Sequence, residues 1–135
     1  MTREDRELAI ADNVSYVDRV IDAIEAPRGL VYIGFSQGAA MAYRAALLGK
    51  HRAQGVIALC GDVPPELNSV PALSWPRVLI GAGVDDSWYT PAKLNADVEM
   101  VTTRGITPTV VRFAGGHAWT AEFQTAAGDW LRVLA

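Results

Sequence analysis

Residues 29–48 read GLVYIGFSQGAAMAYRAALL, and this stretch contains the local pattern from which the fold can be inferred. Residues 29–33 form a short apolar run that indicates a buried β-strand. Residues 39–48 are rich in alanine and indicate a closely packed helix. Between them lies a G-x-S-x-G motif at residues 34–38. Strand, turn and helix in this order form the setting that a nucleophile elbow requires.

Ser36 is the candidate nucleophile of this motif. In such an elbow the serine lies in a strained turn that lifts its hydroxyl clear of the sheet. We expect Gly34 and Gly38 to be required, because a Cβ at either position would crowd the neighbouring backbone. The backbone NH of Gln37, at the start of the following helix, is expected to stabilise an oxyanion.

A serine hydroxyl is a poor nucleophile unless a base accepts its proton. The chain has two histidines. His117 follows two glycines in a loop after the strand-like residues 110–113, where its ring is free to reach sideways. His51 lies in the polar stretch 49–52, where a solvated side chain is the natural interpretation. His117 is therefore the preferred base.

The acid that orients the base should follow another strand of the sheet. Residues 78–83 predict a buried strand, and Asp85 and Asp86 follow it almost directly. Asp86 is the preferred acid. Asp85 remains an alternative, as does Asp62, which follows the preceding strand.

These segments resemble the phospholipase/carboxylesterase branch of the α/β-hydrolases, which includes acyl-protein thioesterases and small bacterial carboxylesterases. The resemblance is carried by three segments, residues 34–38, 83–91 and 115–117. It implies that Ser36, Asp86 and His117 form a catalytic triad. It also implies hydrolysis of a small-molecule ester without a cofactor, with short-chain carboxylic esters as the primary substrates and thioesters or lysophospholipids as further classes.

Three aromatic residues flank the proposed acid and base. Trp88 and Tyr89 follow Asp86, and Trp119 follows His117. They are expected to line an acyl pocket, and packing in the core is the alternative for each of them.

The chain departs from the family pattern at its beginning. Residues 1–28 contain no strand-like run and no loop of the kind that donates a second oxyanion NH in the family. We therefore expect a minimal or truncated α/β-hydrolase core of about four parallel strands with helices on both faces. Loss of one oxyanion donor lowers turnover about a hundredfold to a thousandfold. Two functional hypotheses follow, a serine carboxylesterase of weak activity and a degenerate hydrolase fragment that serves as an interaction module.

Hydrophobic periodicity and turn residues predict the remaining elements. The first helix should end before Pro27, the third should begin at Pro91 with Thr90 as its N-cap, and the longest irregular stretch should run from Pro64 to Pro76. The predicted helices cover residues 3–25, 39–48, 91–104 and 119–134, and the predicted strands cover residues 29–34, 55–60, 77–83 and 108–113.

Composition is consistent with a single domain over residues 1–135. Half of the residues are hydrophobic, and the net charge of −3 is spread without a basic stripe, so neither a nucleic acid nor an anionic membrane is an expected partner. The only cysteine, Cys60, is expected to be a buried thiol, and no metal site is expected. The charged start and the lack of an apolar run of roughly 20 residues favour a cytoplasmic protein.

The strand at residues 29–34 also predicts self-association. Residues 30–33 carry neither charge nor proline, so nothing in them protects an unpaired strand edge from another chain. We therefore expect a homo-oligomer that forms through this strand, with coverage of the edge by the N-terminal helix as the alternative.

Overall fold

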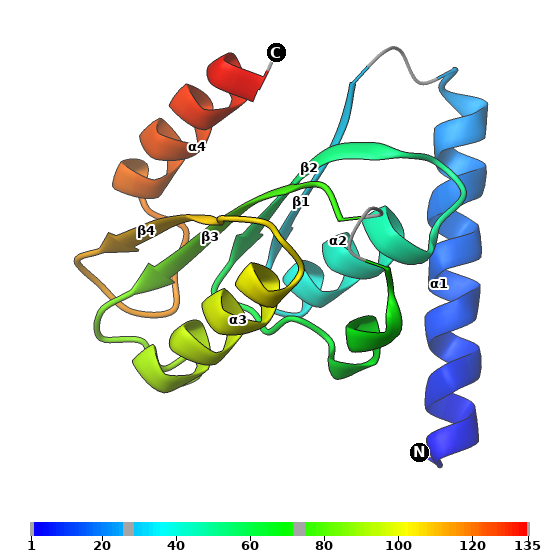
Figure 1. Ribbon diagram of the computed structural model, residues 1–135, viewed down its shortest axis with the longest axis horizontal. Coiled ribbons are helices and arrows are strands. Elements are labelled where there is room, and N and C mark those ends of the chain that lie inside the picture. Colours follow the sequence, from blue (N-terminus) through cyan, green and yellow to red (C-terminus); the bar gives the residue numbers. More distant parts are fainter. Residues whose placement is uncertain (1, 26–28, 72–74, 135) are drawn as a thin grey trace.

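A computed structural model describes residues 2–25, 29–71 and 75–134, and its centre is one parallel sheet of four strands (Figure 1). The strands lie in the order β1-β2-β3-β4, and each pairs with its neighbours in parallel. Parallel neighbours need crossover connections, which accounts for the alternation of strands and helices. The strands are β1 (Leu30–Phe35), β2 (Ala53–Leu59), β3 (Arg77–Gly83) and β4 (Thr109–Phe113).

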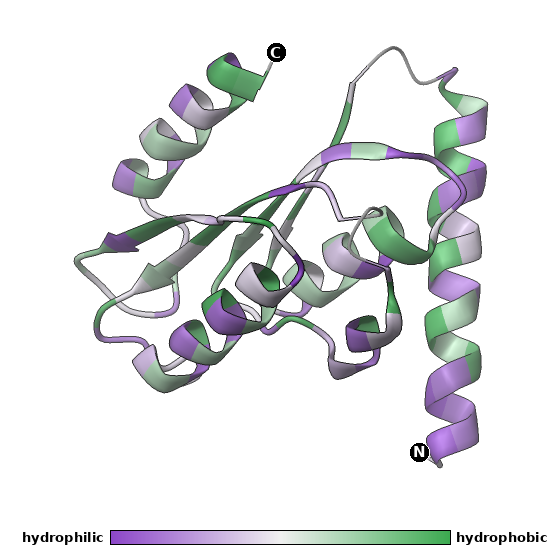
Figure 2. Ribbon diagram, in the orientation of Figure 1, coloured by the Kyte–Doolittle hydropathy of each residue, from purple (hydrophilic) through white to green (hydrophobic). Residues whose placement is uncertain are grey.

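Helices cover both faces of the sheet, as predicted. Figure 1 shows α4 on one side of the strands and both α2 and α3 on the other, with α1 alongside α2. Figure 2 shows that hydrophobic residues predominate on the strands, whereas the first turns of α1 are hydrophilic. The helices are α1 (Arg3–Ala23), α2 (Gln37–Leu48), α3 (Pro91–Thr103) and α4 (Ala121–Leu134), and a 3₁₀ helix, η1, spans Pro65–Ser69.

The two central strands form the core. Val56, Ile57 and Leu59 of β2 and Leu79 and Ile80 of β3 are all completely buried. Burial on both faces explains why these strands read as continuous apolar runs rather than as alternating patterns. The hydrophobic runs therefore identified the strands correctly.

Close packing of α4 on the sheet depends on a glycine in β3. A Cβ at Gly81 would lie 2.1 Å from Cε1 of Phe123, so only glycine admits the ring at this position. Phe123, Ala127 and Trp130 are the buried residues of α4, and their spacing of four and three residues places them on one face of the helix.

The end of the first helix and the stretch before β3 differ from the sequence expectations. The first helix ends at Ala23 rather than at residue 25, and Ile24, which follows the last helical residue, is 62% exposed. Pro27, the expected stop signal, lies outside the described residues. Residues 65–69 form η1 within the stretch expected to be irregular. Its first residue is a proline, whose fixed φ and missing NH suit the first turn of a helix.

None of the helices in the described ranges combines the length and the apolar character that a membrane span requires.

Candidate active site

Ser36 lies between the last residue of β1 and the first residue of α2. Its backbone has φ 57° and ψ −119°, a strained conformation for a residue with a side chain. The backbone NH of Ser36 donates a hydrogen bond of 2.8 Å to the carbonyl of Leu59, which fixes the turn to the end of β2. This is the strained turn that the sequence motif predicts.

The two glycines of the motif are not equivalent. A Cβ at Gly34 would lie 2.0 Å from the carbonyl oxygen of Gly38, so the expectation of crowding at Gly34 is confirmed. The same expectation for Gly38 is wrong, because a Cβ there would meet no atom of the described residues within 4 Å outside its own helix backbone and chain neighbours. The backbone carbonyl of Gly38 makes the close contact at Gly34, whereas the Cα of Gly38 itself faces open space. Gly61, which lies outside the motif, also packs closely against the turn. A Cβ added at this position would lie 2.2 Å from the carbonyl oxygen of Ser36.

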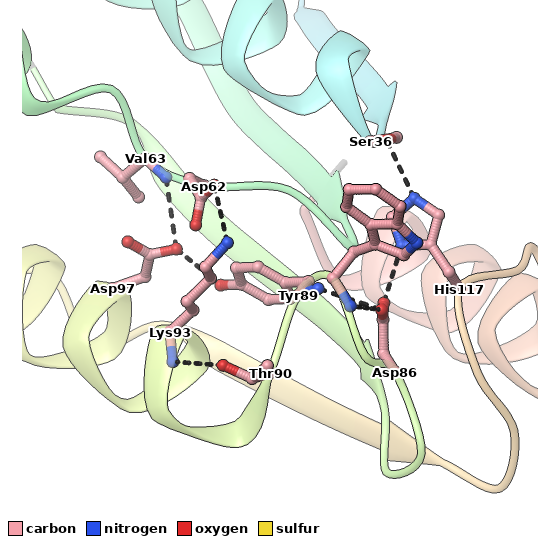
Figure 3. A network of polar contacts seen from close by, with 10 residues as sticks. Ser36, Asp62, Val63, Asp86, Tyr89, Thr90, Lys93, Asp97 and His117 are labelled. Atoms are coloured by element: carbon pink, nitrogen blue, oxygen red, sulfur yellow. Dashed lines mark hydrogen bonds and ion pairs between the residues drawn. The ribbon is translucent and has the colours of Figure 1, made fainter.

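The side chains of Ser36, His117 and Asp86 form a continuous chain of hydrogen bonds (Figure 3). Nε2 of His117 lies 2.9 Å from Oγ of Ser36, and Nδ1 of His117 lies 2.8 Å from Oδ2 of Asp86. The three residues follow β1, β3 and β4, whose carboxyl ends meet at one edge of the parallel sheet.

The loop that carries His117 is fastened to the loop that carries Asp86. The NH of Asp85 donates a 2.9 Å hydrogen bond to the carbonyl of Gly115. A Cβ at Gly83 would lie 2.3 Å from the carbonyl oxygen of Gly116, so the two loops are in close backbone contact. The imidazole also lies beside the ring of Phe35, with the two ring centroids 5.1 Å apart. The position of His117 is therefore fixed from several elements.

Asp86 has a completely buried side chain. Its Oδ1 accepts hydrogen bonds from the backbone NH groups of Trp88 (2.8 Å) and Tyr89 (3.0 Å), which leaves Oδ2 for His117. Burial alone would raise the pKa of Asp86. The hydrogen bond from His117 and those from the backbone outweigh burial and hold the pKa of Asp86 below its ordinary value, so the carboxylate is charged at neutral pH.

The alternative residues occupy different environments. Asp85 is exposed, and His51 makes a 2.9 Å contact with Asp22 near the surface. Asp62 lines the cavity beside Ser36, but its carboxylate faces Lys93 at 4.0 Å. The structure brings Asp86, rather than Asp85 or Asp62, to the imidazole of His117.

The sequence profile of the phospholipase/carboxylesterase family matches residues 3–75, which is more than half of the chain. The chain belongs to this family. The match includes Ser36 and its elbow, whereas Asp86 and His117 lie beyond it. A search of curated proteins found no match.

Several solved structures share the fold. They include SOBER1 of Arabidopsis thaliana (22% identity, TM-score 0.80, 93% of this chain) and the Bacillus cereus carboxylesterase (20% identity, TM-score 0.84, 100% of this chain). Acyl-protein thioesterase 2 of Zea mays is also similar (17% identity, TM-score 0.80, 93% of this chain). The chain spans 64% of the length of each of these three proteins. At these identities the similarity shows the fold alone.

A cavity of about 250 Å³ opens beside the Ser36 hydroxyl. Trp88 forms an outer wall and is 73% exposed, whereas Tyr89 is buried with only 2% exposed. Trp119, the third aromatic residue predicted to line an acyl pocket, lies elsewhere. It lines a groove between Ile33 and α4 and packs edge-on against Phe123. The cavity is lined by Ser36, Gln37, Ala40, Cys60, Gly61, Asp62, Trp88, Tyr89, Lys93 and His117.

A larger hollow lies away from these groups. It has a volume of about 550 Å³ and is lined by residues such as Gln54, Trp75 and Leu134, around the first residues of β2 and β3. None of the candidate site residues lines it.

Cys60 is a buried neighbour of the site. It follows β2 with φ 54°, and burial raises the pKa of its thiol to about 11, with a smaller contribution from the Asp86 carboxylate. The possible metal-ligand atoms of Cys60, Asp86 and His117 all lie within 4.8 Å of one another. However, His117 and Asp86 are at hydrogen-bonding distance, closer together than two ligands about 2 Å from one tetrahedral metal ion. The arrangement is therefore that of hydrogen-bonded side chains.

Asp97 is a second buried carboxylate near the site, and sequence analysis did not identify it. Its Oδ2 accepts hydrogen bonds from the Tyr89 hydroxyl (2.6 Å) and the Val63 backbone NH (3.2 Å) (Figure 3). Burial raises the pKa of Asp97 to about 6, although the hydrogen bonds from Tyr89 and Val63 act in the opposite direction. The only hint in the sequence is an acidic residue among the apolar positions of a predicted helix.

Proposed function

We propose that this protein is a serine carboxylesterase that hydrolyses short-chain esters through an acyl-enzyme. The observation that carries the proposal is the hydrogen-bonded chain Ser36–His117–Asp86, which begins at a strained serine and ends at a buried carboxylate. Residues far apart in the sequence meet in the order nucleophile, base and acid, which is the order that acyl transfer requires.

In the first half of the proposed reaction Ser36 attacks the ester carbonyl. Nε2 of His117 accepts the hydroxyl proton, and the charged Asp86 stabilises the imidazolium that forms. The carbonyl oxygen becomes an oxyanion. Gln37 is the first residue of α2, so its NH belongs to the helix amides that lack an acceptor within the helix. It is the proposed donor to this oxyanion.

Loss of the alcohol completes the first half, and hydrolysis of the acyl-enzyme then regenerates the enzyme. His117 gives its proton to the leaving alcohol as the tetrahedral intermediate collapses to an ester of Ser36. Water then attacks the acyl carbonyl as His117 removes one of its protons. His117 returns this proton to Oγ of Ser36 as the second tetrahedral intermediate collapses to the carboxylic acid and the free serine.

The size of the cavity supports a short acyl chain. About 250 Å³ is less than the usual range for sites that enclose drug-sized ligands, roughly 300–1,000 Å³. Trp88 offers an apolar surface at the mouth of the cavity, where a longer acyl or thioester chain can extend toward solvent. Short activated esters are therefore the first substrates to test, followed by acyl thioesters and lysophospholipids.

Labelling with a fluorophosphonate tests the proposal directly. The adduct should map to Ser36 by mass spectrometry, and Ser36→Ala should abolish both labelling and hydrolysis of p-nitrophenyl acetate. Ser15→Ala, which alters an exposed serine on α1, is the matched control and should retain both. A folded protein that is not labelled at Ser36 would contradict the proposal and favour an interaction module.

A further inference from the structure

We propose that Asp97 is a positioning residue that holds Asp86 in place through Tyr89. This inference rests on the proposed function, because it assigns Asp97 a part in orienting the triad. Tyr89 donates two hydrogen bonds, one from its backbone and one from its side chain. Its backbone NH donates to Oδ1 of Asp86 at 3.0 Å, and its side-chain hydroxyl donates to Oδ2 of Asp97 at 2.6 Å (Figure 3).

The link between Asp97 and the triad is short and buried. Asp97 is 8% exposed and Tyr89 is 2% exposed, so water has little access to compete for either hydrogen bond. Asp97 lies on α3, which provides a rigid base, whereas Tyr89 belongs to the loop between Asp86 and that helix. The hydroxyl of Tyr89 therefore anchors the loop that carries Asp86 to a regular element of the fold.

The same carboxylate fixes a second segment beside the cavity. Val63 donates its backbone NH to Oδ2 of Asp97, and the segment that precedes it contains Cys60, Gly61 and Asp62. One oxygen atom thus connects the segment after β2 with the segment after β3. Both segments line the cavity beside Ser36.

The connection from Asp97 through Tyr89 controls the orientation of the Asp86 carboxylate. Its Oδ1 accepts the NH groups of Trp88 and Tyr89, and this fixes the direction in which Oδ2 meets His117. If the Tyr89 side chain loses its partner, the loop can move and the carboxylate can rotate about its Cβ–Cγ bond. The contact between Oδ2 and Nδ1 of His117 then weakens while the substrate cavity keeps its lining residues.

The environment of Asp97 favours this role over simple packing. Lys93, one helical turn earlier on α3, and Asp62 are the charged groups that influence it most, while Tyr43 and Tyr89 are its neutral titratable neighbours. A charged carboxylate at this depth is costly unless it receives hydrogen bonds. The hydrogen bonds that it receives come from the two segments beside the cavity.

Four variants test the inference. Tyr89→Phe removes the hydroxyl alone, and Asp97→Leu removes the acceptor but keeps a branched side chain with the same number of non-hydrogen atoms. Asp97→Asn retains an oxygen that can accept from both donors, so it is the conservative rescue. Tyr43→Phe is the matched control for Tyr89→Phe, because it also deletes a buried hydroxyl near Asp97 but one without a hydrogen-bond partner among the described residues.

The first measurement is steady-state hydrolysis of p-nitrophenyl acetate. We expect Tyr89→Phe and Asp97→Leu to lower kcat about tenfold with KM nearly unchanged, because the loss concerns the transition state rather than substrate binding. Asp97→Asn and Tyr43→Phe should retain kcat within about twofold. Circular dichroism verifies that each variant is folded.

The second measurement does not depend on turnover. The proton between Nδ1 of His117 and Oδ2 of Asp86 should give a far-downfield proton NMR resonance. This resonance should shift or broaden in Tyr89→Phe and Asp97→Leu, and it should persist in Asp97→Asn and Tyr43→Phe.

The two readouts separate the inference from the proposed function. A resonance that responds as expected in a protein without esterase activity would support the positioning role and contradict the proposed function. Full kcat together with an unchanged resonance in Tyr89→Phe would overturn the positioning role. Should Asp97→Leu fail to fold, Tyr89→Phe and Asp97→Asn decide the question.

Discussion

The imidazole of His117 lies 2.9 Å from the hydroxyl of Ser36, although the two residues are 81 positions apart in the chain. Parallel strands account for this proximity. β1 and β4 are the two edges of the described sheet, and both end on the side where the loops of Ser36 and His117 emerge. Asp86 follows β3, which lies between these two edge strands, and its carboxylate contacts the imidazole of His117.

The burial of Asp86 leads to a prediction about the acid. Asp86→Asn should lower kcat for p-nitrophenyl acetate about 10³- to 10⁴-fold, because an amide can stabilise neither the imidazolium nor the required tautomer. Asp85→Asn and Asp62→Asn alter exposed carboxylates that do not contact His117 and should retain activity within a fewfold. Equal losses in all three variants would contradict the assignment of the acid to Asp86.

The unequal glycines of the elbow predict opposite effects on stability. Gly34→Ala places a Cβ 2.0 Å from a backbone oxygen, so we expect a loss of several kcal/mol, roughly the upper range for a single substitution, or a failure to fold. Gly38→Ala introduces a better helix former into open space on α2 and should raise the free energy of unfolding by up to about 1 kcal/mol. Urea unfolding of both variants measures the difference. A destabilised Gly38→Ala protein would show that this glycine has a role that its surroundings do not reveal.

Sequence patterns predicted most of the fold for identifiable reasons. Central strands such as β2 and β3 are buried on both faces, so their apolar runs stood out. The elbow was visible because Ser36 lies between a strand and a helix, and its φ of 57° agrees with the strained turn expected there. Asp86 was preferred among three aspartates that follow predicted strands, and the family resemblance implied the same residue.

What the sequence did not predict depends on contacts between distant segments. Asp97 receives hydrogen bonds from Val63 and Tyr89, and a carboxylate on a helix gives no sign of which loops will cover it. Trp119 follows the base in the chain, yet its ring turns toward Phe123 and away from the Ser36 cavity. The different roles of Gly34 and Gly38 likewise depend on which atoms face each Cα.

The raised pKa of Asp97 predicts an unusual pH dependence of stability. Its pKa is about 6 in the folded protein against 3.8 as its ordinary value. The folded state therefore holds the proton more tightly than the unfolded state. This contribution to stability is complete below about pH 4 and is lost as the pH rises to about 6, with an upper limit of about 3 kcal/mol.

Asp97→Asn isolates that contribution. The amide keeps an acceptor for Tyr89 and Val63 but never becomes charged, so the variant should be more stable than the original protein at pH 7–8 and about equal to it at pH 4. The pKa of Asp86 is lowered, so its protonation affects stability only below its ordinary pKa of 3.8 and therefore outside the interval from pH 4 to pH 8. Urea unfolding from pH 4 to pH 8 measures both proteins. Identical pH profiles would show that Asp97 does not change its charge in this range.

Because β1 is an edge strand of the described sheet, we still predict self-association through it. Within the described residues β1 pairs only with β2, and its outer edge carries no charge and no proline. Ile33 is 50% exposed and Phe35 is 38% exposed, so apolar surface adjoins the unpaired backbone groups. Such an edge favours pairing with an identical strand. We expect the 135-residue chain to form dimers at micromolar concentration.

A charge placed at this edge should prevent the pairing. Ile33→Lys changes a half-exposed side chain beside the groove that Trp119 also lines, and it introduces the residue that natural proteins use to protect strand edges. Val133→Lys on α4, where the side chain is 73% exposed, is the matched control for added charge. Sedimentation velocity from about 1 to 100 μM should show concentration-dependent dimers for the original chain and for Val133→Lys, and monomers for Ile33→Lys. A monomeric original chain at the highest concentration, or an Ile33→Lys protein that still dimerises, would rule out association through β1.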